Sequence, residues 1–409
     1  MTIDKRLDIL FKLLMLAIIL SPFNYNIYSI RPLDIVVIIF ILLALPIIDV
    51  RSSNFKSVFL FFVVFSASII MGSLFSTNET NIFKGIFIYK YLLPFLLIAV
   101  LYSMPFNAKQ IDTMLKLLFY IYLFLVFWVF FDMIEHSFKQ NAYPQHRPAF
   151  PFRDNSIAKL SDAHLYSTYL SIGLIFFMGI YNKLNISKYY KIPFVAVSLL
   201  ALTLSGSKTG VLVLLVGLFL LLFKINNLLF KINKKYILYA GVGIISFYVS
   251  LHTLTTLNVL SYNFMFVLNR IFDFSFLDNL SQYSRVVKMG KGIEDAAIFQ
   301  YLIGTGIFKS SRIWFDSLIG ALFSHIGLIG ILVFLYLLFR LVLNNRKYLN
   351  RDTMKYNYLF IVILVCYFIA NLITEFFLIS RSVFPFVLYL AILYHYMRLE
   401  YTENNKELS

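Results

Sequence analysis

The sequence predicts an all-α membrane protein, a polytopic bundle of about twelve transmembrane helices that form a single integral membrane domain over residues 1–409. Hydrophobic residues make up 60% of the chain and charged residues only 14%, whereas soluble domains are about half apolar and about a quarter charged. The mean hydropathy of +0.80 agrees with this class. The single cysteine, Cys366, lies inside an apolar run, which excludes an internal disulfide and argues against a cysteine metal cluster.

The predicted helices are the apolar stretches bounded by polar residues, Pro or Asn. The first stretch is as short as a signal peptide, but no small-residue cleavage site follows it, so we interpret it as a retained helix. Two connections are long, residues 135–163 and 258–314, and loops of this length in a compact bundle are usually functional or disordered. The predicted spans are residues 9–22, 35–48, 57–75, 85–102, 113–134, 164–181, 192–206, 209–223, 236–257, 315–339, 357–379 and 383–397.

The basic residues predict the orientation of these helices, because Lys and Arg concentrate in short cytoplasmic loops. When Lys5 and Arg6 are placed inside, every second loop is basic, up to the loop that carries Arg346 and Lys347. Both termini are then cytoplasmic, and both long loops face outward. The formal charge of +16 is therefore an orientation signal and does not indicate nucleic-acid binding.

Ionisable residues collect on the predicted outer face. Cations at a membrane surface suit a lipid-linked phosphate or pyrophosphate, although solvated loop charge is an equally simple reading for most of them. Lys208 and Arg381 lie in very short turns between apolar runs, where snorkelling and a phosphate contact both stay open. Asp316 precedes an apolar run and can act as a helix cap, an active carboxylate, or both. The outer-face cations and histidine are Arg147, Arg153, His164, Lys208, Arg285, Lys288, Arg312 and Arg381.

Two classes of cofactor find no support in the sequence. His136, His146 and His164 lack the short spacing of a metal-binding helix, so we expect no metal. No glycine-rich phosphate-binding motif of the nucleotide-binding type occurs, so we expect no nucleotide and no other cofactor. His325 lies near two glycines of an apolar run and is interpreted as a histidine packed between helices.

Three segments, taken in order, resemble the O-antigen polymerase and O-antigen ligase superfamily of bacterial membrane proteins. They are Leu202-Thr-Leu-Ser-Gly-Ser-Lys-Thr-Gly210, then Tyr283-Ser-Arg-Val286 leading to Leu302-Ile-Gly-Thr-Gly306, and Asp316-Ser317 followed by Ser324-His-Ile-Gly-Leu-Ile-Gly330. The resemblance covers about residues 192–345. The family's usual Arg is replaced by Lys208, and the His that begins the polar pair in ligases is replaced by Asp316, which favours a polymerase.

The resemblance implies a glycosyltransferase of the bacterial cytoplasmic (inner) membrane that joins oligosaccharide units carried on undecaprenyl pyrophosphate. By this resemblance Arg285 and Lys208 would bind the pyrophosphate leaving group, and Asp316 would accept the acceptor's proton. Membrane lipid and, in the same pathway, a chain-length regulator and a flippase are the expected partners. A ligase is the alternative, and a flippase is more distant because transporters place charges midway along their helices.

Overall fold

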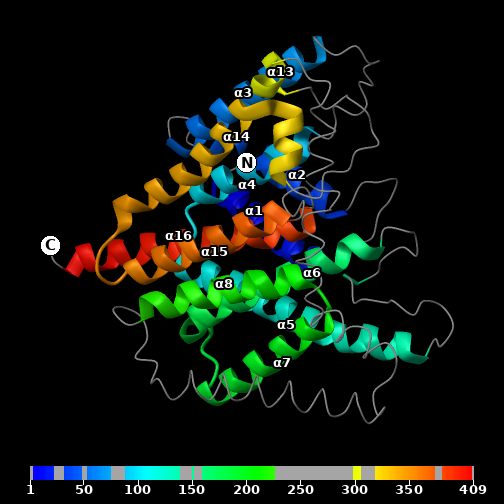
Figure 1. Cartoon of the computed structure of the whole chain (residues 1–409). Coiled ribbons are helices and arrows are strands. Elements are labelled where there is room, and N and C mark those ends of the chain that lie inside the picture. The colour runs from blue at the N-terminus through cyan, green and yellow to red at the C-terminus, as the bar shows by residue number, and fades with distance from the viewer. Residues whose placement is uncertain are drawn as a thin grey trace.

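The computed structural model describes residues 3–22, 32–47, 53–74, 88–138, 150–151, 159–225, 298–304, 318–373 and 380–407. These residues form helices and their connections, and no strand occurs among them, so the predicted all-α class is confirmed for the described part of the chain. Figure 1 shows the helices as one bundle, with the C-terminal end of the last helix at its left edge.

The helices follow the predicted apolar stretches closely. Each stretch within the described residues overlaps a helix, whereas the predicted span 236–257 lies outside them. In chain order they are α1 (Ile3–Leu20), α2 (Pro32–Ala44), α3 (Ser53–Leu74), α4 (Ile88–Ser103), α5 (Ala108–Phe138), α6 (Lys159–Ile180), α7 (Lys191–Leu204), α8 (Lys208–Ile225), α13 (Ile298–Ile303), α14 (Leu318–Asn344), α15 (Met354–Ile373) and α16 (Ser380–Glu407). Short 3-10 turns are η1 (Leu45–Ile47), η3 (Tyr181–Leu184), η4 (Lys188–Tyr190) and η5 (Asn345–Tyr348).

Several helices are longer than their apolar stretches, because local bonds outside the apolar run extend them. Helix α5 begins at Ala108, five residues before the predicted start at 113, since Asn107 and Gln110 cap it reciprocally. The Gln110 backbone N–H donates to Asn107 Oδ1 at 2.9 Å, and the Asn107 N–H donates to Gln110 Oε1 at 3.1 Å. The C-terminal end of α5, the N-terminal end of α6 and the short α13 all lie within the predicted long loops.

Four helices of the described residues are long and apolar enough to cross a membrane, which makes the chain a membrane protein by length and composition. They cover Ala108–Ile134, His164–Leu184, Ile326–Tyr348 and Met354–Leu372. Shorter apolar helices accompany them, including Lys191–Leu204 and Lys208–Leu221. The described residues thus support the membrane class, while the total of about twelve spans stays a prediction.

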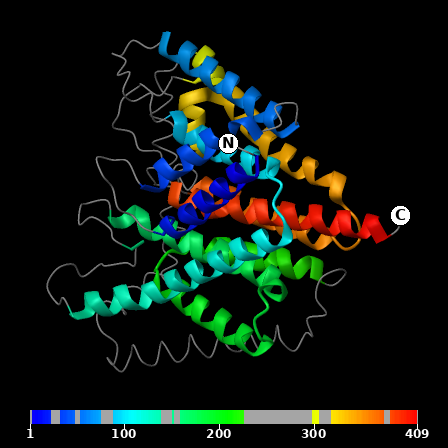
Figure 2. The ribbon, with the colours of Figure 1, turned by 180° about the vertical axis from the view of Figure 1, so that it is seen from behind.

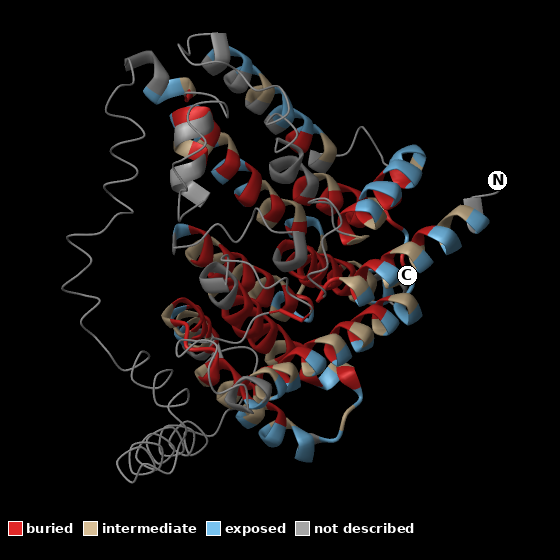
Figure 3. Cartoon of the chain, turned by 90° about the vertical axis from the view of Figure 1, so that its right-hand side faces the viewer, coloured by how far each residue is buried: buried red, intermediate tan, exposed pale blue. Residues whose placement is uncertain are grey.

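Helix α6 is the centre of the bundle. Of its most apolar window 83% is buried, against 39% for α5, which turns residues such as Tyr120 and Phe127 outward as a lipid-facing helix does. Helix α6 packs against α5, α7, α8, α15 and α16. Figures 1 and 2 show α8 and α15 on one face of this group and α1 and α5 on the other. Buried residues accordingly line the inside of the bundle in Figure 3.

Helix α14 changes direction at Gly327, which has a φ of +64° that favours glycine. A Cβ atom at this position would lie 2.4 Å from the carbonyl carbon and oxygen of Leu302 and 2.5 Å from the backbone nitrogen of Gly304. The backbones of α13 and α14 therefore touch only because residue 327 lacks a side chain. Two of the three segments that carry the family resemblance meet at this contact.

Candidate functional site

The structure describes a minority of the predicted site residues. Arg147, Arg153, Arg285, Lys288, Arg312 and Asp316 lie outside the described residues. Arg381 lies in the first turn of α16, where the structure describes its backbone. His164, on α6, and Lys208, at the start of α8, are both described, and both are half-buried. The candidate site is therefore built from these two residues and their neighbours.

Lys208 follows a tight turn between α7 and α8. The Ser205 N–H donates to the carbonyls of Ala201 and Leu202 at 3.0 and 3.2 Å, and the Ser205 hydroxyl donates to Leu202 O at 2.6 Å. Gly206 then adopts a φ of +62°, the conformation that commonly ends a helix. Because serine and glycine satisfy the last carbonyls of α7 locally, the chain reverses within three residues and places Lys208 at the first position of α8.

His164 contacts this turn from the neighbouring helix. Its Nδ1 atom lies 3.0 Å from the hydroxyl oxygen of Ser207, the residue that directly precedes Lys208. Ser207 is fully buried, so its hydroxyl is a link between helices, and a nucleophilic role is ruled out by the absence of access. The hydroxyl donates this bond when Nδ1 is unprotonated and accepts it when Nδ1 carries the proton. The structure thus brings His164, a predicted site residue, into contact with the residue before Lys208, a second predicted site residue, although His164 and Ser207 are 43 positions apart.

Helices α6 and α8 interlock directly beneath this contact. A Cβ atom at Gly210 would lie 1.7 Å from Ser167 Oγ, so only glycine fits at residue 210. The Ser171 hydroxyl donates to Gly210 O at 2.7 Å, which adds a bond between the helices. Small and hydroxyl residues at a helix contact are typical of membrane bundles. They hold the start of α8, and with it Lys208, in a defined position relative to His164.

The electrostatics of this turn favour an anion. The first turn of α8 presents backbone N–H groups and the positive end of the helix dipole, and Lys208 adds a full positive charge there. A cation at a helix N-terminus is unfavourable in isolation, and a nearby anion reverses that effect. Ser167 Oγ, which is fully buried and has no hydrogen-bond partner, lies against the same turn of α8. Phosphate oxygens are anionic acceptors that would suit these donors.

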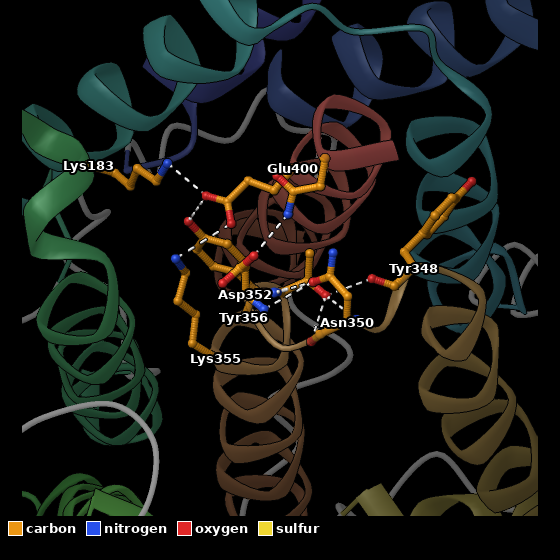
Figure 4. Close-up of polar contacts among 9 residues, drawn as sticks. Lys183, Tyr348, Asn350, Asp352, Lys355, Tyr356 and Glu400 are labelled. Carbon is orange, nitrogen blue, oxygen red and sulfur yellow. Dashed lines mark hydrogen bonds and ion pairs between the residues drawn. The ribbon is translucent and has the colours of Figure 1, made fainter. Parts of the chain in front are cut away.

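A second polar cluster, which sequence reasoning missed, lies at the opposite end of α6 and centres on Glu400 of α16 (Figure 4). Its carboxylate accepts a hydrogen bond from Tyr356 Oη at 2.6 Å and lies 2.9 Å from Lys183 Nζ and 3.5 Å from Lys355 Nζ. Burial alone would raise the pKa of Glu400, but the bonds from Tyr356 and Lys183 and the charges of Lys183 and Lys355 outweigh it, so the pKa is lowered. No sequence motif predicts this cluster, because its members come from three separate segments, η3, α15 and α16.

Further contacts fasten the same end of the bundle. Asn404 Nδ2 donates to Asp352 Oδ2 at 2.9 Å, and Tyr396 Oη donates to Asp112 Oδ1 at 2.8 Å. The start of α5, the turn after α6, the start of α15 and the end of α16 therefore gather at one end of the bundle, and His164 and Ser207 lie at the other. The pattern of basic loops predicts that the four segments at the Glu400 end all lie on the cytoplasmic side.

Within the described ranges, no group of three or more His, Cys, Asp or Glu side chains is arranged to hold a metal ion. No family model matches the chain, and no curated protein matches it. The resemblance to the O-antigen polymerase and ligase superfamily accordingly stays a prediction from the sequence.

Proposed function

We propose that this chain polymerises oligosaccharide units linked to undecaprenyl pyrophosphate at the outer face of the bacterial cytoplasmic membrane. The observation that carries the proposal is the 3.0 Å contact between His164 and Ser207, which joins the end of the first long loop to the turn of Lys208. It supports one shared outer site, because His164 and Lys208, the residue after Ser207, were predicted on that face from separate segments. The full protein would have about twelve spans, with both termini in the cytoplasm.

The proposed reaction needs an acceptor, a leaving group and a base, but no nucleotide. A hydroxyl oxygen of the incoming unit attacks the anomeric carbon of the growing chain, and the bond from that carbon to the pyrophosphate oxygen breaks. The hydroxyl proton passes to Asp316, and undecaprenyl pyrophosphate leaves with the electron pair. Lys208 and Arg285 stabilise the negative charge that develops on the leaving group.

Each described residue has a distinct part in this proposal. Lys208 binds a phosphate oxygen at the first turn of α8, where the helix dipole adds to its charge. His164 and Ser207 hold the turn that carries Lys208, and the α6–α8 contact at Gly210 gives it a rigid base. The Glu400 cluster at the far end keeps α6 and α16 together and takes no part in the chemistry.

The experiment that tests this proposal is the lipid-linked and surface glycan profile of a strain that lacks the gene. A polymerase predicts a mature lipid that carries at most one repeat unit, with complementation restoring long chains. Long chains that build up on the lipid carrier without reaching their acceptor would instead identify a ligase. Loss of all surface glycan, with single units retained on the inner leaflet, would identify a flippase and overturn the proposal.

A further inference from the structure

The end of the connection between α6 and α7 and the first two residues of α7 form an unusually exposed apolar segment, Ser187–Ile192. Tyr189 is 89% exposed, Ile192 74% and Tyr190 65%. In the rest of the described chain, the most exposed large hydrophobic residue is Tyr120 at 63%, and it lies on the outward face of α5. These three side chains are consecutive or nearly so, which concentrates their apolar surface at one point.

The backbone of this segment is held in place although its side chains project. Tyr181 Oη donates to Ser187 O at 3.2 Å, and the Tyr190 N–H donates to the same carbonyl at 3.1 Å. Lys191 Nζ lies 5.5 Å from the centre of the Tyr181 ring. The segment is therefore a structured corner that presents two tyrosines and an isoleucine, with Lys188 and Lys191 beside them in the sequence.

Tyrosine and lysine together are typical of the boundary between membrane and water. The tyrosine ring is apolar and its hydroxyl is polar, so it partitions to the headgroup level, while lysine is attracted by anionic headgroups. The corner lies at the same end of the bundle as the Glu400 cluster, because Lys183, which binds Glu400, lies in η3 immediately before it. The sequence assigns that end to the cytoplasmic side.

We propose that Ser187–Ile192 docks into the headgroup region of the inner leaflet and binds anionic phospholipid there. This assignment rests on the predicted topology and is independent of the proposed transferase reaction. It has a consequence for the outer site, because α7 begins at this corner and has only 14 residues. At about 1.5 Å per residue α7 rises about 21 Å, which is less than the hydrocarbon thickness of about 30 Å.

The turn of Lys208 then lies roughly 9 Å below the outer boundary of the hydrocarbon, and deeper if α7 is tilted. A lysine at that depth is costly unless an anion or water reaches it. A phosphate group attached to a lipid can enter from the side of the bundle and meet Lys208 at this level. The short α7 therefore suits a substrate that arrives within the membrane plane.

Depth-dependent fluorescence quenching tests the docking. The chain has two tryptophans, so Trp128→Phe and Trp314→Phe give a background free of tryptophan, into which Tyr189→Trp is introduced. The full chain is reconstituted into vesicles of phosphatidylethanolamine and phosphatidylglycerol that carry a spin label either on the headgroup or deep in the acyl chain. We expect stronger quenching by the headgroup label. The matched control Tyr120→Trp, on the lipid face of α5, is expected to be quenched more by the deep label.

Quenching of the Tyr189→Trp probe by aqueous iodide, with none by either lipid label, would overturn the docking and leave the corner as a surface for a soluble partner. The choice of lipid is tested by adding Lys188→Gln and Lys191→Gln. The headgroup quenching should fall in anionic vesicles and become equal to that in phosphatidylcholine vesicles. If the Tyr189→Trp probe with Lys188 and Lys191 unchanged is quenched equally in both kinds of vesicle, the anionic preference is wrong.

A third probe measures the depth of the turn. Leu212 is 44% exposed and lies one helical turn beyond Lys208 on α8. A recessed turn puts it near the bilayer centre, so Leu212→Trp should be quenched most by the deep label. A turn at the outer boundary would put it about 6 Å deep and reverse that order. These readouts need no glycan, so their failure is separate from any failure of the proposed polymerase.

Discussion

His164 Nδ1 and Ser207 Oγ lie 3.0 Å apart and join the N-terminal ends of α6 and α8. Because Ser207 directly precedes Lys208, this bond links His164, the residue that follows the first long loop, to the turn that carries Lys208. The two helices are locked together beneath it by Gly210 and Ser171. This geometry favours a positioning role of His164 toward Lys208 in the proposed site.

Replacing His164 by Ala should weaken activity less than removing the charge of Lys208. One lost hydrogen bond costs about 0.5–1.5 kcal/mol, up to about tenfold in rate, whereas losing a charge that stabilises the transition state costs about a hundredfold or more. Glycan chain length at equal expression is the measurement, with Thr203→Val as a control because its hydroxyl bonds only Leu199 O of the same helix. Equal loss of long chains in His164→Ala and Lys208→Ala would make His164 a direct participant.

Gly210→Ala should lower stability, because the new methyl group would lie 1.7 Å from Ser167 Oγ and 2.9 Å from the Ser167 backbone carbon. Overpacking of this kind costs roughly 1–3 kcal/mol. The midpoint of thermal denaturation in detergent measures it. Gly179→Ala is the matched control, since the atoms it meets belong to the flexible side chain of Leu359. A variant Gly210→Ala as stable as the unmodified protein would show that α6 and α8 can move apart.

Stability should depend on pH through Glu400. Its pKa is lowered from the ordinary 4.5, so its contribution is fully present above about pH 5 and is lost as pH falls through the folded-state pKa. Glu400→Gln should be less stable at pH 7 by about 1–3 kcal/mol, since Lys183 and Lys355 lose their counter-charge. Thermal denaturation from pH 7 to pH 3 should therefore show a flatter profile for this variant. Parallel profiles for the two proteins would assign the acid sensitivity to other carboxylates.

Topology is predicted from the alternation of basic loops, and reporter fusions measure it directly. Fusions at Lys234 and Arg346 should report the cytoplasm, and fusions at Asn141 and Asp295 the exterior. The clustering of Lys183, Lys355 and Glu400 agrees with a single side for three of the segments concerned. A cytoplasmic signal near Asp295 would remove Arg285 from the outer face and end the proposed mechanism.

The reacting groups are tested by conservative replacements. Arg285→Ala should abolish long chains, and Arg285→Lys should restore them only in part because lysine cannot bind phosphate in two places at once. Lys208→Arg should be tolerated, since arginine is usual at this position in the superfamily that the sequence resembles, and it keeps the positive charge. Asp316→Asn keeps a good helix cap but cannot accept a proton. Normal chain lengths in Asp316→Asn would leave this residue as a cap and remove it from the mechanism.

The sequence by itself determined the class of protein and the positions of the helices. Apolar runs long enough to span a bilayer have few other uses, because backbone polar groups in lipid must bond within a helix. For the same reason the predicted stretches coincide with α1 to α8 and α14 to α16 in the described residues. The turn at Ser205–Lys208 was also readable, since serine and glycine at the end of an apolar run satisfy the last carbonyls locally.

Only the tertiary structure decided which residues of different helices meet. The pairs His164–Ser207, Lys183–Glu400 and Gly327–Leu302 join segments far apart in the chain, and each depends on how neighbouring helices are rotated and shifted along one another. Hydrophobic periodicity is weak in helices that are apolar on nearly all sides, so it cannot specify that rotation. Close packing of small and hydroxyl residues specifies it instead, and such contacts become visible only when both helices are in place.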